Sequence, residues 1–209
     1  MKTQVIAFDL DGTLSDPASG IQASINHALE DLGRPPAPPG ELDQYIGIPL
    51  RDIFERLLGP TGESAINRAV DAYRDHYMRT GFSENTLYPQ IPLLLERLGS
   101  LPVRLYVTTL KTPRIARRVI EHFGLQDHFV EILGCGSDRR KADLLEQIRR
   151  METGAQFLMV GDRHEDMRAG QQAGFLCVGV LWGYGSRREL LDHGADHLIG
   201  SPLELMKLL

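Results

Sequence analysis

The sequence contains little that would direct the chain to a membrane, a disulfide framework or the outside of the cell. It has 2 cysteines among 209 residues. Cys135 and Cys177 form no spacing pattern, so we expect free thiols in a reducing compartment. No apolar run approaches the length of a bilayer-spanning helix, and residues 1–10 do not resemble a signal peptide. These absences predict a cytoplasmic protein with no membrane partner.

An excess of positive charge is also missing. The 23 lysines and arginines are outnumbered by 28 acidic residues, and the formal net charge is −5. A protein that binds a nucleic-acid backbone needs the opposite balance, so nucleic acid is not expected as a partner. An acidic protein that acts on small anions must gather positive charge locally. The 42% hydrophobic and 24% charged residues exclude a disordered chain.

The pattern along the chain indicates an α/β architecture that is interrupted once. An apolar strand at 5–8 is followed, from residue 16 to residue 84, by apolar residues at helical spacing only. From Tyr88 onward, apolar strands alternate with amphipathic helices, which favours a parallel sheet. The expected later strands are 103–107, 130–133, 157–160 and 176–180. We therefore predict an α/β core of residues 1–15 and 85–209, with a helical insertion of residues 16–84 after the first strand.

Two acids, a glycine and a threonine follow the first strand. Asp9 and Asp11 are two residues apart, so their side chains project to the same side. Carboxylates this close repel each other unless a cation lies between them, and a hard ion such as Mg2+ fits best. Gly12 allows a sharp turn, and Thr13 offers a hydroxyl beside exposed N–H groups, which suits a phosphate. A plain surface turn is the alternative interpretation.

Two further strand ends carry groups that suit a phosphoryl group. Ligands of parallel sheets bind at the carboxyl ends of the strands. The strand at 103–107 runs into Thr108-Thr109-Leu110-Lys111, although capping of the next helix explains the threonines equally well. Lys141 opens a helix, where a cation is poorly placed unless an anion lies nearby. Both segments therefore stay candidates for binding an anion.

A third acid follows the strand at 157–160. Asp162 takes the same position after its strand as Asp9 does. Asp9, Asp11 and Asp162 form an all-oxygen set that suits Mg2+. His164 lies beside them but has no second histidine at ligand spacing, so we expect an ordinary surface residue.

These residues spell out a known pattern. The chain resembles the haloacid dehalogenase-like hydrolase superfamily, in its phosphoglycolate phosphatase-like branch with a helical cap. The resemblance spans nearly the whole chain and rests on four ordered motifs: residues 8–14 (FDLDGTL), the strand end at Thr109, Lys141, and Gly161-Asp162 with Asp166 four residues on. It implies a doubly wound, Rossmann-like parallel sheet with the cap inserted after the first strand.

The resemblance also implies roles for the acids. Asp9 would attack the phosphorus of a phosphate monoester and form an aspartyl-phosphate. Asp11 would protonate the leaving oxygen and then activate the water that hydrolyses the intermediate. Mg2+ would be held by Asp9, Asp162 and the backbone carbonyl of Asp11, and Asp166 would orient the metal or its waters. An acid two residues after the nucleophile is the phosphatase form of the pattern.

Contacts with the phosphoryl oxygens follow from the same resemblance. Thr13, Thr109 and Lys141 would make them, with Gly12 shaping the turn. Leu110 takes a position that is usually small or polar, so Thr108 stays open beside Thr109 as the binding hydroxyl. Lys111 is a weaker candidate than Lys141 for the lysine that binds the phosphate.

Substrate choice is expected in the helical cap. Family members meet the leaving group with the segment at 45–51, so Gly47 and Arg51 are expected at the substrate. Arg51 could pair with an anionic end, and Tyr45 could stack on a base. The tail at 180–186 is similar to a subgroup of 5′-nucleotidases. Phosphoglycolate and nucleoside 5′-monophosphates are therefore both candidate substrates of a monomer or weak homodimer.

Two other functions remain open. A phosphomutase would return the phosphoryl group to a sugar. A regulatory module would keep a long-lived aspartyl-phosphate, and Asp11, a ready activator of water, argues against this.

Overall fold

The computed structural model describes residues 3–38, 40–46, 48–136 and 139–209. The chain divides into two compact units. The first, which we call the α/β unit, consists of Met1–Asp16 and Leu87–Leu209, and the second, the helical unit, consists of Pro17–Thr86. The chain passes between the units at two short strands, β2 (Ser15–Asp16) and β3 (Thr86–Leu87).

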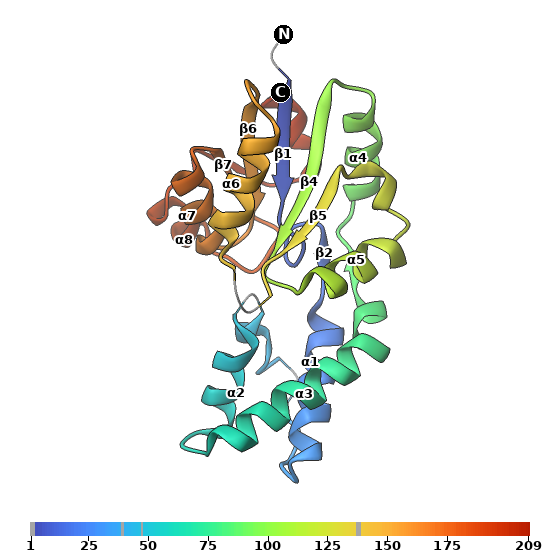
Figure 1. Ribbon diagram of the computed structural model, residues 1–209, viewed down its shortest axis with the longest axis vertical. Coiled ribbons are helices and arrows are strands. Elements are labelled where there is room, and N and C mark those ends of the chain that lie inside the picture. The colour runs from blue at the N-terminus through green and yellow to red at the C-terminus, as the bar shows by residue number, and fades with distance from the viewer. Residues whose placement is uncertain (1–2, 39, 47, 137–138) are drawn as a thin grey trace. The chain divides into compact units, whose positions relative to one another are not determined.

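The α/β unit is built on a six-stranded parallel sheet with the order β5-β4-β1-β6-β7-β8 (Figure 1). Its strands are β1 (Gln4–Phe8), β4 (Val103–Thr109), β5 (Glu131–Gly134), β6 (Gln156–Gly161), β7 (Leu176–Val180) and β8 (His197–Ile199). From β1 the chain builds the sheet to one side and then, from β6, to the other. This reversal makes the sheet doubly wound and places a ligand crevice at the carboxyl ends beside β1. The predicted fold class is confirmed.

The strands form where the sequence is apolar without interruption, because the sheet is buried on both faces. Val5, Ile6 and Ala7 of β1 are fully buried. The helices of this unit are α4 (Ile91–Gly99), α5 (Pro113–His122), α6 (Lys141–Met151), α7 (His164–Ala173) and α8 (Arg187–Asp192), with 3-10 turns η3 (Gln126–His128) and η4 (Pro202–Lys207). Apolar residues of α6 and α7 pack with Val5 and Ala7 in one core cluster. The edge strand β8 was not predicted, since three residues are too few to show a period.

The helical unit contains α1 (Ala18–Asp31), α2 (Leu50–Leu58) and α3 (Glu63–Arg79), with 3-10 turns η1 (Asp43–Tyr45) and η2 (Gly81–Glu84). Its core is the set of apolar residues at helical spacing, among them Ile25 of α1 and Ala69 of α3. Within the described ranges of the chain, no helix is both long and apolar enough to cross a lipid bilayer.

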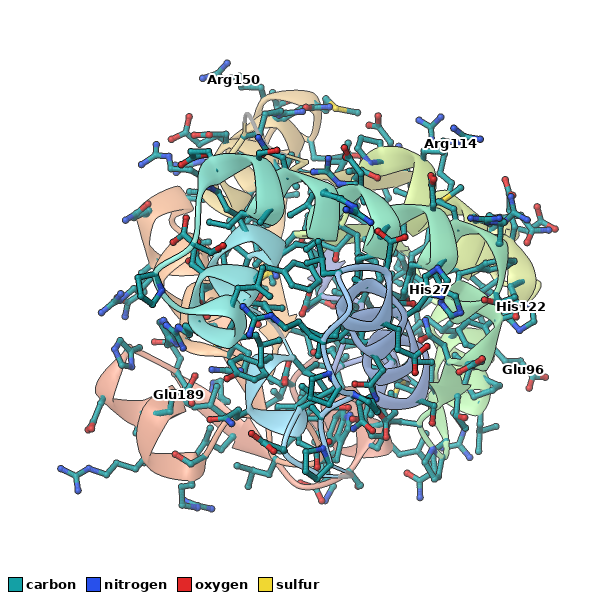
Figure 2. All side chains as sticks on the ribbon, turned by 90° about the horizontal axis from the view of Figure 1, so that it is seen from below. His27, Glu96, Arg114, His122, Arg150 and Glu189 are labelled. Atoms are coloured by element: carbon teal, nitrogen blue, oxygen red, sulfur yellow. The ribbon has the colours of Figure 1, made fainter. Side chains whose placement is uncertain are left out.

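The helical unit contains two stacked histidines, from which we expect a pH-dependent stability. The rings of His27 (labelled in Figure 2) and His76 lie with centroids 4.6 Å apart. Burial, and then the neighbouring His27, lowers the pKa of His76. The unfolded chain therefore binds more protons, so this stabilising contribution is complete above about pH 6.5 and is lost as the pH falls. We expect the Tm to fall more in the wild type than in His76→Gln between about pH 7.5 and pH 5.5.

Differential scanning calorimetry at several pH values measures this difference. His122→Gln, which changes an exposed histidine on α5, is the control and should keep the pH dependence of the wild type. Identical curves for His76→Gln and the wild type would refute the assignment.

Candidate active site

Three carboxylates meet at the carboxyl-terminal edge of the sheet. Asp9 follows β1, Asp162 follows β6, and Asp166 lies in the first turn of α7. All three are buried, with Asp9 only 6% exposed. One oxygen from each lies within 4.8 Å of the others. This three-acid cluster could hold a metal ion.

Glycine allows the acids to approach this closely. A Cβ on Gly12 would lie 2.2 Å from Asp162 Oδ2, and the φ of Gly12 is +82°. A Cβ on Gly161 would lie 2.3 Å from Asp166 Cγ. Gly12 is therefore required both for space and for its left-handed backbone. The next residue, Thr13, is fully buried and donates its hydroxyl to Asp162 Oδ1 at 3.4 Å.

Lys141, the first residue of α6, reaches the same cluster. Its Nζ lies 2.8 Å from Asp9 Oδ1 and also contacts Asp166 Oδ1. The side chain is 5% exposed. Burial lowers the pKa of Lys141, but Asp166 and Asp9 outweigh this effect and raise its pKa overall. The sequence predicted that an anion must lie near this helix start, and the structure places two carboxylates there.

The cluster carries more negative charge than Lys141 can neutralise. Burial raises the pKa of Asp9 well above its ordinary value despite the attraction of Lys141, and the neighbouring carboxylates raise it further. Burial, with the charge of Asp166, likewise raises the pKa of Asp162 to about 7. When all three carboxylates are ionised, one ammonium leaves two negative charges in excess, which a divalent cation would balance. The donor set therefore fits a hard divalent metal ion.

The carboxylate of Asp11 is not part of the three-acid cluster. Its Oδ2 pairs with Nζ of Lys111, and these side chains are 13% and 11% exposed. Its other oxygen, Oδ1, is buried and has no hydrogen-bond partner within the described part of the chain. Sequence reasoning treated Lys111 as a weak competitor of Lys141, whereas the structure pairs each lysine with a different aspartate of the opening motif.

The end of β4 gives different surroundings to Thr108 and Thr109, the two threonines that the sequence allowed as the phosphate-binding hydroxyl. Thr108 is buried, and its hydroxyl donates to Met159 Sδ at 3.6 Å, inside the core. Thr109, the last residue of β4, accepts the backbone N–H of Lys111 at its Oγ1, at 3.3 Å. The side chain of Leu110 packs against the core cluster of α6 and α7. Of these residues, Thr109 is therefore the better candidate for a side-chain contact with a phosphoryl oxygen.

A model of the family described as haloacid dehalogenase-like hydrolase matches residues 6–180. The chain belongs to this family. The resemblance inferred from the four motifs is confirmed.

Relatives of this haloacid dehalogenase-like hydrolase carry several names. A 5′-nucleotidase of Pseudomonas aeruginosa is 36% identical over 98% of this chain and 94% of its own length. A phosphoglycolate phosphatase of Aquifex aeolicus is 30% identical over 99% and 96%. The tyrosine-protein kinase PtkA of Mycobacterium tuberculosis is 40% identical over 90% of this chain, which spans 65% of that protein. Among solved structures, a haloacid dehalogenase-like family hydrolase of Streptococcus pneumoniae has a TM-score of 0.88 at 30% identity, covering 99% and 98% of the two chains.

The loop after β7 contributes residues to the site of this hydrolase, whereas the sequence marked this loop only by its similarity to a subgroup of 5′-nucleotidases. The backbone N–H of Tyr184 donates to Asp162 Oδ2 at 2.8 Å, and Trp182 Nε1 donates to the carbonyl of Thr13 at 3.0 Å. A Cβ on Gly183 would lie 2.4 Å from Asp162 Cβ. The loop therefore holds the Asp162 side chain in place. The sequence offers Gly183 beside its only tryptophan as a sign of a close contact, but it does not indicate Asp162 as the partner.

The segment at 45–51, which the sequence predicted to meet the substrate, belongs to the helical unit. Gly47 falls outside the described residues. Tyr45 ends η1 and is half-buried. The guanidinium of Arg51 pairs with Glu55 at 3.0 Å and with Glu63. Two carboxylates of the same unit thus already oppose the charge of Arg51.

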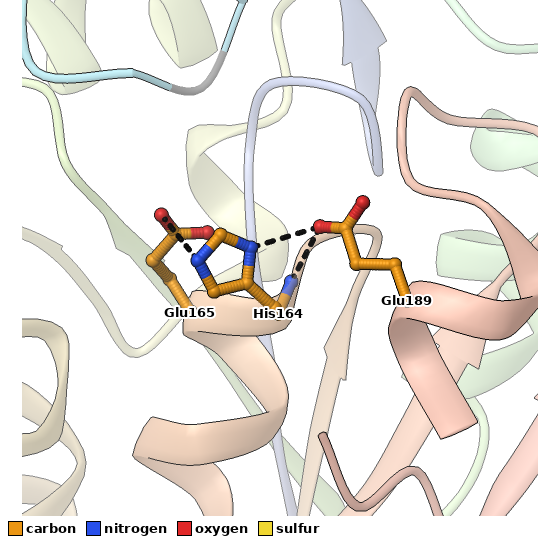
Figure 3. A group of neighbouring side chains, drawn as sticks. All are labelled: His164, Glu165 and Glu189. Carbon is orange, nitrogen blue, oxygen red and sulfur yellow. Dashed lines mark hydrogen bonds and ion pairs between the residues drawn. The ribbon is translucent and has the colours of Figure 1, made fainter. Parts of the chain in front are cut away.

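His164 is a partly exposed residue that takes part in a cluster of ion pairs beside the site. Its side chain is half-buried, with Nδ1 2.9 Å from Glu189 Oε1 and Nε2 3.1 Å from Glu165 Oε1 (Figure 3). Its backbone N–H also donates to Glu189 Oε1, at 3.0 Å (Figure 3). Although burial alone would raise it, hydrogen bonds from His164 and Arg163 lower the pKa of Glu189 to about 2. This cluster ties α8 to the start of the helix that carries Asp166.

Proposed function

We propose that the protein is a Mg2+-dependent hydrolase of small phosphate monoesters that works through an aspartyl-phosphate. The observation that carries the proposal is the arrangement of Asp9, Asp162 and Asp166 around the ammonium of Lys141, with Asp11 beside them in the sequence and outside their cluster. This set provides a nucleophile, a cation site and a separate proton carrier. Phosphoglycolate and nucleoside 5′-monophosphates are candidate substrates because relatives carry the corresponding names.

The first step forms the intermediate. A carboxylate oxygen of Asp9 attacks phosphorus while the bond from phosphorus to the leaving oxygen breaks, and Asp11 gives that oxygen a proton. Lys141, 2.8 Å from Asp9 Oδ1, holds the carboxylate in position, and Thr109 contacts a phosphoryl oxygen. Asp9, Asp162 and the backbone carbonyl of Asp11 would hold the metal ion, and Asp166 would orient it. A bound Mg2+ supplies positive charge that stabilises the transferring phosphoryl group.

The second step restores the enzyme. Asp11, now a carboxylate, takes a proton from water, and the resulting oxygen attacks phosphorus. The bond from phosphorus to Asp9 breaks, so the carboxylate returns and phosphate leaves. We assign both proton transfers to Asp11 Oδ1, which is buried and has no hydrogen-bond partner among the residues described.

Metal dependence tests the proposal. Protein stripped with a chelator should release phosphate from p-nitrophenyl phosphate at least about 100-fold more slowly than after Mg2+ is restored. Because the added charge relieves repulsion among the three acids, Mg2+ should also raise the Tm. Equal rates with and without Mg2+ would contradict the proposal.

A second candidate is transfer of the phosphoryl group from Asp9 to an acceptor hydroxyl other than water. The observation that favours phosphoryl transfer is the 40% identity to a protein named a tyrosine kinase. A phosphomutase belongs to the same class of reaction. The protein is incubated with a hexose phosphate, or with a tyrosine peptide and a phosphoryl donor. Free phosphate and phosphorylated acceptor are then measured. Free phosphate alone would exclude transfer, and an aspartyl-phosphate that lasts seconds or less would exclude a regulatory module.

A further inference from the structure

The loop after β7 is fastened at two places to the segment that follows β1. Trp182 Nε1 donates to the carbonyl of Thr13 at 3.0 Å. The phenol hydroxyl of Tyr184 donates to Asp16 Oδ1, in β2. This side-chain bond adds to the backbone contacts of the loop, and it holds the loop to the segment that begins with Asp9.

The chain around Asp16 is itself tightly turned. The preceding residue, Ser15, donates its backbone N–H to the carbonyl of Leu10 at 3.0 Å and accepts the backbone N–H of Gly12 at 2.8 Å. Ser15 is fully buried. These bonds fix the position of Asp16 relative to Asp9, so the phenol has a firm anchor.

The backbone of Tyr184 holds a carboxylate that comes from a different strand. Its N–H donates to Oδ2 of Asp162, which follows β6, at 2.8 Å. The glycines on either side allow this close approach, since a Cβ on Gly183 would lie 2.4 Å from Asp162 Cβ, and one on Gly185 1.8 Å from the Asp162 carbonyl oxygen. Tyr184 therefore links the two strand ends that supply Asp9 and Asp162.

The separation of these two acids decides which cation fits between them. Asp9 and Asp162 follow the adjacent strands β1 and β6, and their oxygens lie within 4.8 Å in the three-acid cluster. Mg2+ requires nearly octahedral oxygen ligands at about 2.0–2.1 Å, whereas Ca2+ accepts about 2.3–2.6 Å and a variable geometry. A link that limits the separation of the two acids therefore favours the smaller ion.

We infer that Tyr184 is a positioning residue that sets the separation of Asp9 and Asp162 and so makes the site select Mg2+ over Ca2+. The phenol is the part of the residue that reaches Asp16, so the side chain has a role apart from the backbone N–H. This inference rests on the metal site of the proposed function.

Calorimetric titration of the full chain with Mg2+ and with Ca2+ tests the inference without turnover. We expect the wild type to bind Mg2+ more tightly. Tyr184→Phe keeps the backbone N–H but loses the hydroxyl, and should lose about tenfold in the ratio of Mg2+ to Ca2+ affinity, as for other groups that orient metal ligands. Asp16→Ala removes the acceptor and should lower this ratio equally, and the double variant should lose no more than Tyr184→Phe. Because both ions are divalent, the ratio is insensitive to the charge that Asp16→Ala removes.

Tyr106→Phe is the matched control. Its phenol hydroxyl also donates to a carboxylate, Glu152 Oε1 at the end of α6, and this variant should keep the wild-type ratio. The inference is overturned by a wild type that binds Ca2+ at least as tightly as Mg2+, or by Tyr184→Phe with an unchanged ratio, including equal losses for both ions. If Asp162→Asn binds Mg2+ as the wild type does, the ion lies elsewhere, and the proposed metal site fails together with the inference.

Discussion

Replacement of Asp9 by asparagine is expected to reduce phosphate release by at least about 10⁴-fold, because the amide cannot form the acyl phosphate. The rate is measured with p-nitrophenyl phosphate and Mg2+, and the covalent intermediate by intact-protein mass spectrometry after an acid quench. Asp9→Asn should show neither product nor phosphoenzyme.

Two variants serve as comparisons for Asp9→Asn. Asp11→Asn should fail at a later step, because p-nitrophenolate leaves without a proton while hydrolysis of the intermediate still needs a base. Phosphoenzyme should therefore accumulate in it. Asp127→Asn changes an exposed acid in η3 and should retain the wild-type rate. A wild-type rate in Asp9→Asn would refute the assignment of the nucleophile.

Replacement of Gly12 by alanine is expected to reduce Mg2+ affinity and activity by at least about 100-fold. The new Cβ would lie 2.2 Å from Asp162 Oδ2, so the carboxylate has to move out of the cluster. The backbone at φ +82° adds strain of about 1–2 kcal/mol. Isothermal titration with Mg2+ and the Mg2+-dependent rise in Tm measure the loss without relying on turnover.

Gly124→Ala is the matched control. Gly124 also has a positive φ, +67°, but a Cβ there would meet nothing within 4 Å. This variant should lose stability and keep both Mg2+ affinity and activity. Wild-type Mg2+ binding by Gly12→Ala would show that the contact with Asp162 does not govern the metal site.

The sequence contains enough information to predict the sheet and the acids at its edge, because both depend on chain order. Uninterrupted apolar runs mark buried parallel strands, and parallel strands bring their carboxyl ends to one edge. Asp9 and Asp162 were therefore expected together, and the structure places them within one cluster. The helix start at Lys141 indicated an anion by electrostatics alone.

Features that depend on where a turn directs its side chains were not predictable. The alternation of side chains along a strand does not show whether Thr108 or Thr109 faces the site unless the residue at which β4 ends is known. The partner of Lys111 depends on the path of the chain after that end. Tyr184 acts on Asp162 through its backbone N–H, which any residue type provides, so the residue itself gives no signal.

One hydrogen bond within the α/β unit has a consequence for how proteins of this kind can diversify. The backbone N–H of Tyr88 donates to the carbonyl of Leu14 at 3.1 Å, so the points where the chain leaves and re-enters this unit are held together. The entropic cost of closing a loop grows only slowly with its length. Segments of very different size can therefore be exchanged between these two points while residues 9–14 keep their positions, so recombination can replace the insertion without rebuilding the chemistry of the sheet edge.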